Sequence, residues 1–407
     1  MNMVVTYRDR PGWLILLLIA IIGLNLRPFL VALGPLMNRI IADTGLSHGQ
    51  ASLLTMLPMV IMGLGALVFA AIPSKRSGRQ MLLIALTLLG ASNLTRLASA
   101  DGQILILTAV VAGVAVAIAQ SIIPGMIKQH FAQQTAIVTG IYSASLMIGG
   151  AMGAKLMPWL ALQGFSWQQA LSWLALPCIV ALLVSLVGLP SSNTNASAKP
   201  QFKSLIQSRR TWSLILHFGI INGAYLTLVT WLASYYQQLG WSSEQSSQLI
   251  VVLSICQAAC ALLLPTLIRH QSDRRPFTLF MLISLAVGFA GIIYQPEQHP
   301  YLWASACGIG LGGAFSLAIL VALDHFRCSQ QAGMLTTLMQ GGGFIIAAFF
   351  PLLFSQLIEY TGHYDWGWGM HFMLIIIASA LTIGFDPEEY DMAMARPITL
   401  SQQSTAV

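Results

Sequence analysis

Two basic residues, Arg27 and Lys155, lie inside long apolar segments of the chain. If such a segment crosses a bilayer, a central cation costs at least about 2.5–3.5 kcal/mol, and charges in this position usually mark a functional site. The planar guanidinium of Arg27 suits recognition of an anion. We therefore expect Arg27 to be a fixed positive charge facing an internal cavity; a structural arginine satisfied by carbonyl groups is the alternative.

Lys155 and His217 each leave two interpretations open. Lys155 either strengthens an anion site or reaches outward to the membrane interface. His217 lies near the start of an apolar segment. Because histidine titrates near neutral pH, it is a candidate for coupling substrate movement to protons. A packed or interfacial histidine is the more common case.

Uncharged polar and aromatic residues in the same segments are further candidates for contact with a substrate. Asn25 and Pro28 flank Arg27, and a proline loosens a helix and frees a carbonyl group. Asn222 and Tyr225 are three residues apart, so they share one face of a helix. The full set of candidate substrate-binding residues is Arg27, Asn25, Gln120, Tyr142, Lys155, Asn222, Tyr225, Gln257, Phe315, Gln340 and Phe344, in which Tyr142 and the two phenylalanines would wall the cavity.

The acidic residues are informative because of where they are absent. All 13 fall in loops, tails or the ends of apolar segments. An interior with basic side chains and no carboxylate favours an anionic substrate over a cation. The segments hold no acid pair and no HExxH motif, and the five cysteines form no CxxC pair. We therefore expect no enzyme, no cofactor and no metal site.

The segments that carry these residues are long enough to cross a membrane. Hydrophobic residues make up 56% of the 407 residues and charged residues only 8%, which suits a chain solvated by lipid. Because roughly 20 apolar residues cross a bilayer as a helix, the sequence predicts an all-α membrane protein with twelve transmembrane helices. The predicted helices are 13–37, 49–72, 79–99, 102–127, 136–160, 167–189, 212–237, 245–268, 276–294, 300–323, 331–357 and 367–385.

Most of the 19 basic residues fall on one side of these helices. The positive-inside rule makes that side cytoplasmic, so both termini would be cytoplasmic and the protein would lie in a bacterial-type inner membrane. The basic clusters then act as topology signals and do not indicate a nucleic-acid partner. The candidate gating residues of two cytoplasmic loops are Lys75, Arg76 and Arg79, and Asp273, Arg274 and Arg275.

A break in composition divides the chain. Residues 190–211 are rich in Ser, Asn, Ala and Lys and are typical of a flexible linker. We therefore expect one six-helix bundle at 1–189 and a second at 212–407, ending in a short cytoplasmic tail. An internal repeat supports this division, because GLSHGQASLL at 45–54 matches GWSSEQSSQL at 240–249, and 113–131 matches 308–326 at the same offset of 195.

Several segments resemble the major facilitator superfamily and, within it, the cyanate-permease-like (CynX/NimT) branch. They include GLNLRP at 23–28, AQSIIPGMIKQHF at 119–131, GIINGAYLTLVTWL at 219–232 and MQGGGFIIA at 339–347. The superfamily's signature between the second and third helices is reduced to PSKRSGRQ at 73–80, with Lys75 at its usual aspartate position. The resemblance implies transport of a small anion or a compact planar molecule, since members of this branch are associated with cyanate uptake or nitroimidazole export.

These observations lead first to a secondary active transporter that moves a small anion, cyanate-like or another organic or inorganic one, by alternating access. Export of compact planar heteroaromatic compounds is the second interpretation. A non-transporting membrane sensor is the third, and it is disfavoured because little of the chain lies outside the helices to transmit a signal. We expect a small-molecule substrate and the lipid bilayer as the only partners, and a monomer.

Overall fold

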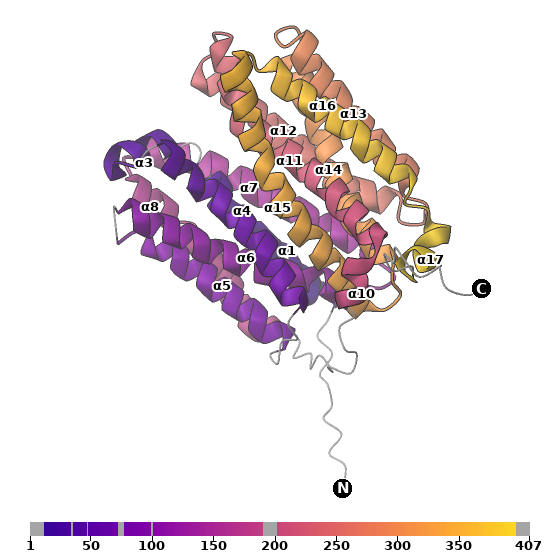
Figure 1. Cartoon of the computed structure of the whole chain (residues 1–407). Helices are drawn as coiled ribbons and strands as arrows, with labels where there is room; N and C mark the ends of the chain where they lie inside the picture. Colours follow the sequence, from indigo (N-terminus) through magenta and orange to yellow (C-terminus); the bar gives the residue numbers. More distant parts are fainter. Residues whose placement is uncertain are drawn as a thin grey trace, which may run out of the picture.

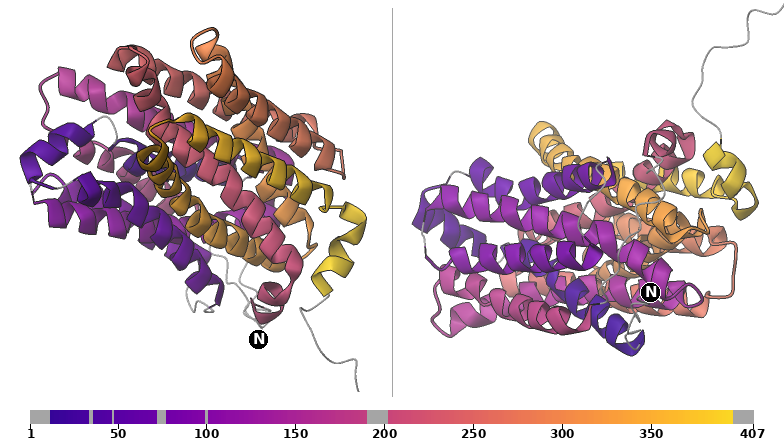
Figure 2. Two further views of the ribbon diagram at one scale, coloured as in Figure 1. Left: turned by 45° about the horizontal axis from the view of Figure 1, so that its top comes forward. Right: turned by 90° about the horizontal axis from the view of Figure 1, so that it is seen from below.

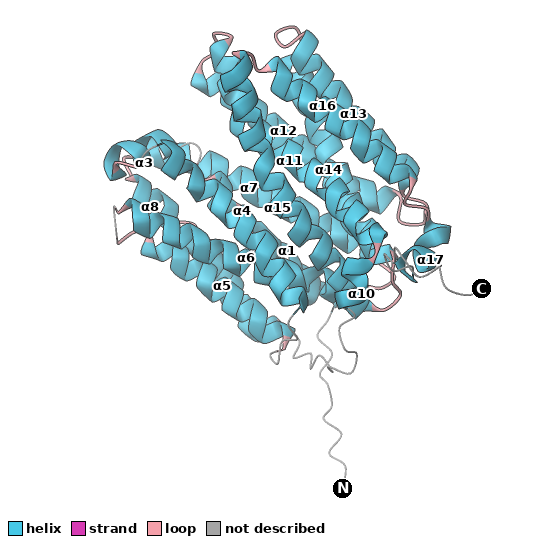
Figure 3. Ribbon diagram, in the orientation of Figure 1, coloured by secondary structure: helices cyan, strands magenta, loops and turns pink. Residues whose placement is uncertain are grey.

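The computed structural model of the chain describes residues 12–33, 36–46, 48–71, 77–98, 101–189 and 202–395. Within these ranges all regular structure is helical and there is no strand (Figure 3). The helices are α1 (Gly12–Asn25), α2 (Pro28–Val31), α3 (Met37–Thr44), α4 (His48–Ala71), α5 (Gly78–Thr95), α6 (Gly102–His130), α7 (Thr135–Leu162), α8 (Trp167–Ser172), α9 (Ala175–Gly188), α10 (Phe202–Gln207), α11 (Arg209–Gln238), α12 (Ser243–Leu267), α13 (Arg275–Tyr294), α14 (Pro300–Asp324), α15 (Ser329–Thr361), α16 (Asp365–Ile383), the 3₁₀ turn η2 (Pro387–Glu389) and α17 (Tyr390–Ala395).

Ten helical segments in the described part of the chain are long and apolar enough to cross a membrane. Two of them combine a pair of helices: Gly12–Val31 holds α1 and α2, and Trp167–Gly188 holds α8 and α9. α4 contributes a shorter apolar stretch, Leu53–Val68. α5 occupies the place of the third predicted helix, and its first residues are polar. Together these segments correspond to the twelve helices predicted from the sequence.

The first predicted helix, 13–37, is interrupted. α1 ends at Asn25, the chain bends at Leu26 and Arg27, and α2 begins at Pro28. Proline has no N–H to donate, and its ring clashes with the preceding helical turn, which explains a break at this point. The membrane-crossing part then ends at Val31, well before residue 37.

The predicted linker is only partly irregular. Residues 190–201 lie outside the described residues. The rest of the segment is mostly helical: α10 ends at Gln207, and α11 begins at Arg209 after the extended residue Ser208. Ser208 caps α11 by accepting a hydrogen bond from the backbone N–H of Arg210 at 3.2 Å, so the seventh long helix begins a few residues before the predicted position 212.

The helices up to α9 and those from α11 onward lie on two sides of the molecule (Figure 1; Figure 2). The two groups converge near α10, and their ribbons diverge toward the opposite end (Figure 1). We call the end that holds α10 and α17 the linker end. Thr337 of α15 donates a hydrogen bond to the carbonyl oxygen of Ser121 in α6 at 3.1 Å. Close backbone contact between α6 and α15 continues toward the linker end, where a Cβ on Gly333 would lie 2.9 Å from Gly125 Cα.

Candidate functional site

The break between α1 and α2 places Arg27 outside regular helical geometry. The Arg27 carbonyl accepts from the backbone N–H groups of Leu30 at 3.1 Å and Val31 at 3.3 Å, which starts α2. On the other side of the break, Asn25 Nδ2 donates to the Ile21 carbonyl at 2.8 Å, while Asn25 Oδ1 is buried without a partner in the described structure. Arg27 therefore lies in the short non-helical stretch that separates α1 from α2.

Glycines of α7 allow this break to pack closely. A Cβ on Gly149 would lie 2.2 Å from the Leu24 carbonyl oxygen, and one on Gly153 would lie 3.0 Å from Pro28 Cα. Gly150 faces Arg27, where a Cβ would lie 3.6 Å from Arg27 Cβ. Small residues let helices approach in membranes, so the glycines of α7 fix where the break and its arginine lie.

Arg27 is buried against aromatic rings from the other side of the molecule. Its side chain is 6% exposed, and the guanidinium carbon lies 4.7 Å from the Tyr225 ring centroid and 5.2 Å from the Phe315 ring centroid. Tyr225 belongs to α11 and Phe315 to α14. No carboxylate or carbonyl among the described residues accepts a hydrogen bond from this guanidinium. Its N–H groups are therefore available to an anion, while the ring faces stabilise the positive charge.

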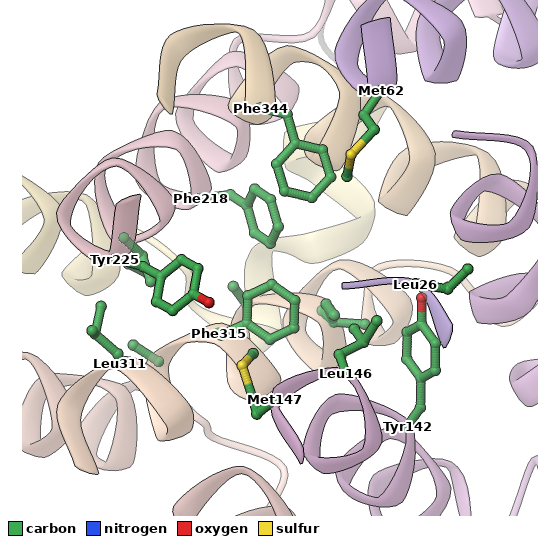
Figure 4. Packing of buried hydrophobic residues seen from close by; sticks show 14 of the residues in the cluster. Leu26, Met62, Tyr142, Leu146, Met147, Phe218, Tyr225, Leu311, Phe315 and Phe344 are labelled. Carbon is green, nitrogen blue, oxygen red and sulfur yellow. The ribbon is translucent and has the colours of Figure 1, made fainter. Parts of the chain in front are cut away.

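The rings beside Arg27 continue into an aromatic cluster. Phe315 lies 5.5 Å from Phe218, and Phe218 lies 5.4 Å from Phe344, measured between ring centroids. Figure 4 shows these rings with Tyr225 and the methionines Met62 and Met147 around one central region. The sequence pointed to Phe315 and Phe344 but missed Phe218, although Phe218 lies four residues before Asn222 and seven before Tyr225 and so shares their helix face.

Tyr142 and two glutamines are buried and have side-chain atoms without hydrogen-bond partners. The Tyr142 hydroxyl, and both amide atoms of Gln120 and of Gln340, are unpaired within the described structure. Asn222 differs, because its Nδ2 donates to the Phe218 carbonyl at 2.9 Å. Gln257 is buried on α12, and its backbone carbonyl lies against Gly312 of α14.

The structure does not bring Lys155 and His217 to Arg27. Lys155 is exposed on α7, as expected for a lysine that reaches outward and not for one in a buried anion site. His217 is buried in α11, where its Nε2 and the Thr382 hydroxyl are 3.0 Å apart and its ring packs edge-on against Phe385. Both contacts are typical of a packed histidine that joins α11 to α16.

The loop candidates form ion pairs. Arg274 pairs with Asp324 at 3.3 Å, and Arg275 pairs with Asp273 at 2.9 Å and with Asp386 at 2.8 Å. The hydrogen bond from Arg275 lowers the pKa of the Asp273 carboxyl. These bonds tie the loop after α12 to the ends of α14 and α16.

The corresponding loop of the first half is only partly described. Arg79 donates to the Leu186 carbonyl at 2.6 Å, which links α5 to α9. Lys75 and Arg76 lie outside the described residues.

The structure also has an apolar groove of about 860 Å³ between the end of α15 and the start of α16. None of the predicted site residues lines this groove.

The sequence profile of the Major Facilitator Superfamily matches residues 13–348. The chain belongs to this superfamily. It is 38% identical to the cyanate transport protein CynX of Escherichia coli, over 92% of this chain and 98% of that protein. It is 28% identical to the 2-nitroimidazole transporter of the same organism, over 89% of this chain and 92% of that protein. These relatives confirm the resemblance to the cyanate-permease-like branch, and they are transporters, not enzymes.

Solved structures confirm the fold. The proton:xylose symporter XylE superposes with a TM-score of 0.75 at 12% identity, over 92% of this chain and 95% of that one. The human organic anion transporter MFSD10 gives a TM-score of 0.70 at 12% identity, over 92% of this chain and all of that one. The chain is therefore an all-α, multi-pass membrane transporter with the major-facilitator architecture.

Proposed function

We propose that this transporter moves a small monovalent anion, such as cyanate, across the bacterial inner membrane, and that Arg27 is its counter-charge. The carrying observation is a buried guanidinium with two aromatic neighbours and no acidic partner among the described residues. An unpaired buried charge is costly, and a bound anion removes that cost. The 38% identity to a cyanate transport protein supports the same class of substrate.

The division of the site between the two groups of helices supports transport by alternating access. Arg27 comes from the first group of helices, whereas Tyr225 and Phe315 come from the second. An anion bound at Arg27 would strengthen contact between the groups near mid-membrane, and rocking of the two groups would then expose it to either side. Contacts between α6 and α15 toward the linker end support a state that is closed there.

We propose the orientation of the chain in the membrane from its charges. The linker end carries Arg210, Arg274 and Arg275, among other basic residues. By the positive-inside rule it faces the cytoplasm, with both termini on that side. We propose that the monomer is the transporting unit, since the site is formed by residues of one chain.

Transport of labelled cyanate into proteoliposomes tests this proposal. Arg27→Gln should reduce saturable uptake at least tenfold, and Arg27→Lys should retain only part of it, because lysine keeps the charge but not the planar fork. Arg39→Gln is the matched control, since Arg39 is exposed on α3. If Arg27→Gln left the transport of every small anion unchanged at equal protein insertion, the mechanism would be wrong.

Export of a compact heteroaromatic compound is a second candidate function. The rings of Tyr225, Phe315 and Phe218 offer faces on which a planar molecule could stack. The 28% identity to a 2-nitroimidazole transporter also supports it. Cells that lack the protein should become more sensitive to 2-nitroimidazole, and unchanged sensitivity across related compounds would argue against export.

A further inference from the structure

The apolar groove between α15 and α16 lies at the end of the molecule opposite the linker end, which we call the outer end. α15 ends there at Thr361, the chain turns at Gly362, and α16 returns from Asp365 (Figure 1). The volume of the groove, about 860 Å³, falls within the range of about 300–1,000 Å³ that is typical of small-molecule sites. The groove is separate from the site at Arg27, because no residue of that site lines it.

The lining of the groove changes from polar to apolar along its length. Tyr360, Asp365 and Trp366 line it at the outer end, whereas Leu353 and Met373 line it deeper between the two helices. Leu353 lies seven residues before Tyr360 on α15, which is roughly 10 Å along the helix axis. Tyrosine and tryptophan are enriched at the level of the lipid head groups. A polar end at this level and an apolar end in the hydrocarbon match the two parts of a phospholipid.

The polar groups at the outer end of the groove are free to bind a ligand. Asp365 is exposed, and its carboxylate forms no ion pair or hydrogen bond with the described part of the chain. Tyr360 is 91% exposed and Trp366 is 64% exposed. A carboxylate only accepts hydrogen bonds, whereas the tyrosine hydroxyl and the indole N–H donate them. Together these groups suit a zwitterion, with an ammonium group for the carboxylate and a phosphate for the donors.

The charges around the groove also favour a cationic group. Among the described residues from α12 onward, lysine and arginine occur only in and beside the loops after α12 and after α14, which lie at the linker end. The acidic residues at the outer end of this half are Glu244, Glu297, Glu359 and Asp365. The field at this end therefore attracts an ammonium group and repels a head group with a net negative charge.

We propose that this groove holds one phospholipid with an amine head group. Its ammonium group binds Asp365, and its phosphate accepts hydrogen bonds from Tyr360 and Trp366. One acyl chain lies deeper in the groove, against Leu353 and Met373. Phosphatidylethanolamine has these features, whereas phosphatidylglycerol carries a net negative charge and offers the carboxylate no cation. The proposal does not depend on which substrate the protein transports.

Phosphatidylethanolamine and phosphatidylglycerol with identical acyl chains are the matched probes. The full chain in detergent is equilibrated with an equal mixture of the two lipids. Native mass spectrometry then counts the lipids that stay bound, and each released lipid is identified by its own mass. The wild-type chain should retain one phosphatidylethanolamine with a preference of roughly fivefold over phosphatidylglycerol, the factor that one charge near a membrane surface is worth.

Three variants locate the bound lipid. Asp365→Asn removes the charge and should bring the ratio of the two lipids close to one. Glu359→Gln is the matched control, because Glu359 is exposed near the end of α15 and does not line the groove; it should keep the wild-type ratio. Gly369 lines the groove, and a Cβ there meets nothing within 4 Å. The indole of Gly369→Trp should therefore fill the groove and remove the retained lipid of either class.

The outcomes distinguish this site from a structural role of Asp365. An acidic residue in the first turn of α16 also suits the helix dipole, but that role would not change which lipid is retained. Equal retention of the two lipids by the wild-type chain would overturn the proposal, and so would a preference that survives in Asp365→Asn or in Gly369→Trp. A doubled mass without bound lipid would show that a second copy covers the groove. The wild-type ratio decides against the proposal even if a variant does not fold.

Discussion

The guanidinium carbon of Arg27 lies 4.7 Å from the centroid of the Tyr225 ring. The two residues are far apart in sequence and belong to different groups of helices, so this contact joins the groups at the centre of the molecule. The ring face stabilises the cation without neutralising it, which leaves the full positive charge for a ligand. A carboxylate in the same place would compete with an anionic substrate.

Substitutions of Tyr225 test the value of this ring. Tyr225→Leu should weaken anion binding by about 0.5–2 kcal/mol, because the cation–π contact is lost. Tyr225→Phe keeps the ring face and should bind nearly as the wild type does. Calorimetric titration with cyanate measures both. Equal losses in the two variants would show that the hydroxyl, not the ring, is what matters.

Gly149 should tolerate no larger side chain. A Cβ there would lie 2.2 Å from the Leu24 carbonyl oxygen, so Gly149→Ala forces the helix break away from α7. Overpacking of this kind costs about 1–3 kcal/mol. Thermal unfolding in detergent should show a lower midpoint for this variant. Gly369→Ala is the control, because a Cβ at Gly369 meets nothing within 4 Å. Equal midpoints would contradict the packing described for the break.

The Arg274–Asp324 pair should be strongly coupled, because its side chains are 8% and 25% exposed. Removing one partner of a buried pair costs about 3–5 kcal/mol when the other is left charged and unpaired. We expect Arg274→Ala and Asp324→Ala to destabilise the fold, and the double variant to lose less than the sum. The Arg210–Glu389 pair is the comparison; Glu389 is 60% exposed, so its coupling should stay below about 1 kcal/mol. Additive losses in the first pair would rule out coupling there.

A cross-link between the helix groups tests alternating access. The Thr337 hydroxyl donates to the Ser121 carbonyl oxygen at 3.1 Å, so cysteines in the double variant Ser121→Cys and Thr337→Cys should be close enough for a short, reducible bifunctional thiol reagent to join them. Transport should stop when the cross-link forms and return on reduction, because the two groups of helices can no longer separate at the linker end. Each single variant should transport normally after the same treatment. Undiminished flux in the cross-linked protein would exclude rocking about this contact.

Docking of the C-terminal helix α17 should depend on pH. The rings of His325 and Tyr390 stack with centroids 3.8 Å apart, and His325 Nδ1 lies 2.7 Å from the Val321 carbonyl. Burial lowers the pKa of His325 to about 4, with a smaller contribution from the charge of Arg210. When α17 is undocked, the His325 side chain is exposed to water and should have a pKa near 6.5. Below pH 6.5 the undocked state therefore binds more protons than the docked state. Docking is then complete above about pH 6.5 and weakens as pH falls toward 4.

Hydrogen exchange of residues 387–395 measures this docking. The protection factors of these amides, which are the intrinsic exchange rates divided by the observed rates, should fall as the pH is lowered from 6.5 to 4. His325→Phe keeps a ring for the stack and cannot be protonated, so its protection factors should not change with pH in this range. The prediction fails if the wild type and the phenylalanine variant respond to pH in the same way.

The sequence by itself determined the helices and the central charge. A bilayer sets the length of each apolar segment, so the lengths and positions of the apolar runs predicted twelve long helices. The presence of Pro28 also predicted a loosened helix at this position, and the structure has a break there. Because a mid-membrane arginine is costly, Arg27 stood out before any contact of its side chain was known.

Only the tertiary structure decided which residues meet Arg27. Helical periodicity assigns each residue to a face of its own helix, but it does not say which helix that face meets. Phe218 is central because α11 crosses near α14 and α15, and Lys155 is exposed because of how α7 is turned. His217 bonds to Thr382, 165 residues away. Such contacts depend on how the two groups of helices pack, and no local pattern in the chain specifies that.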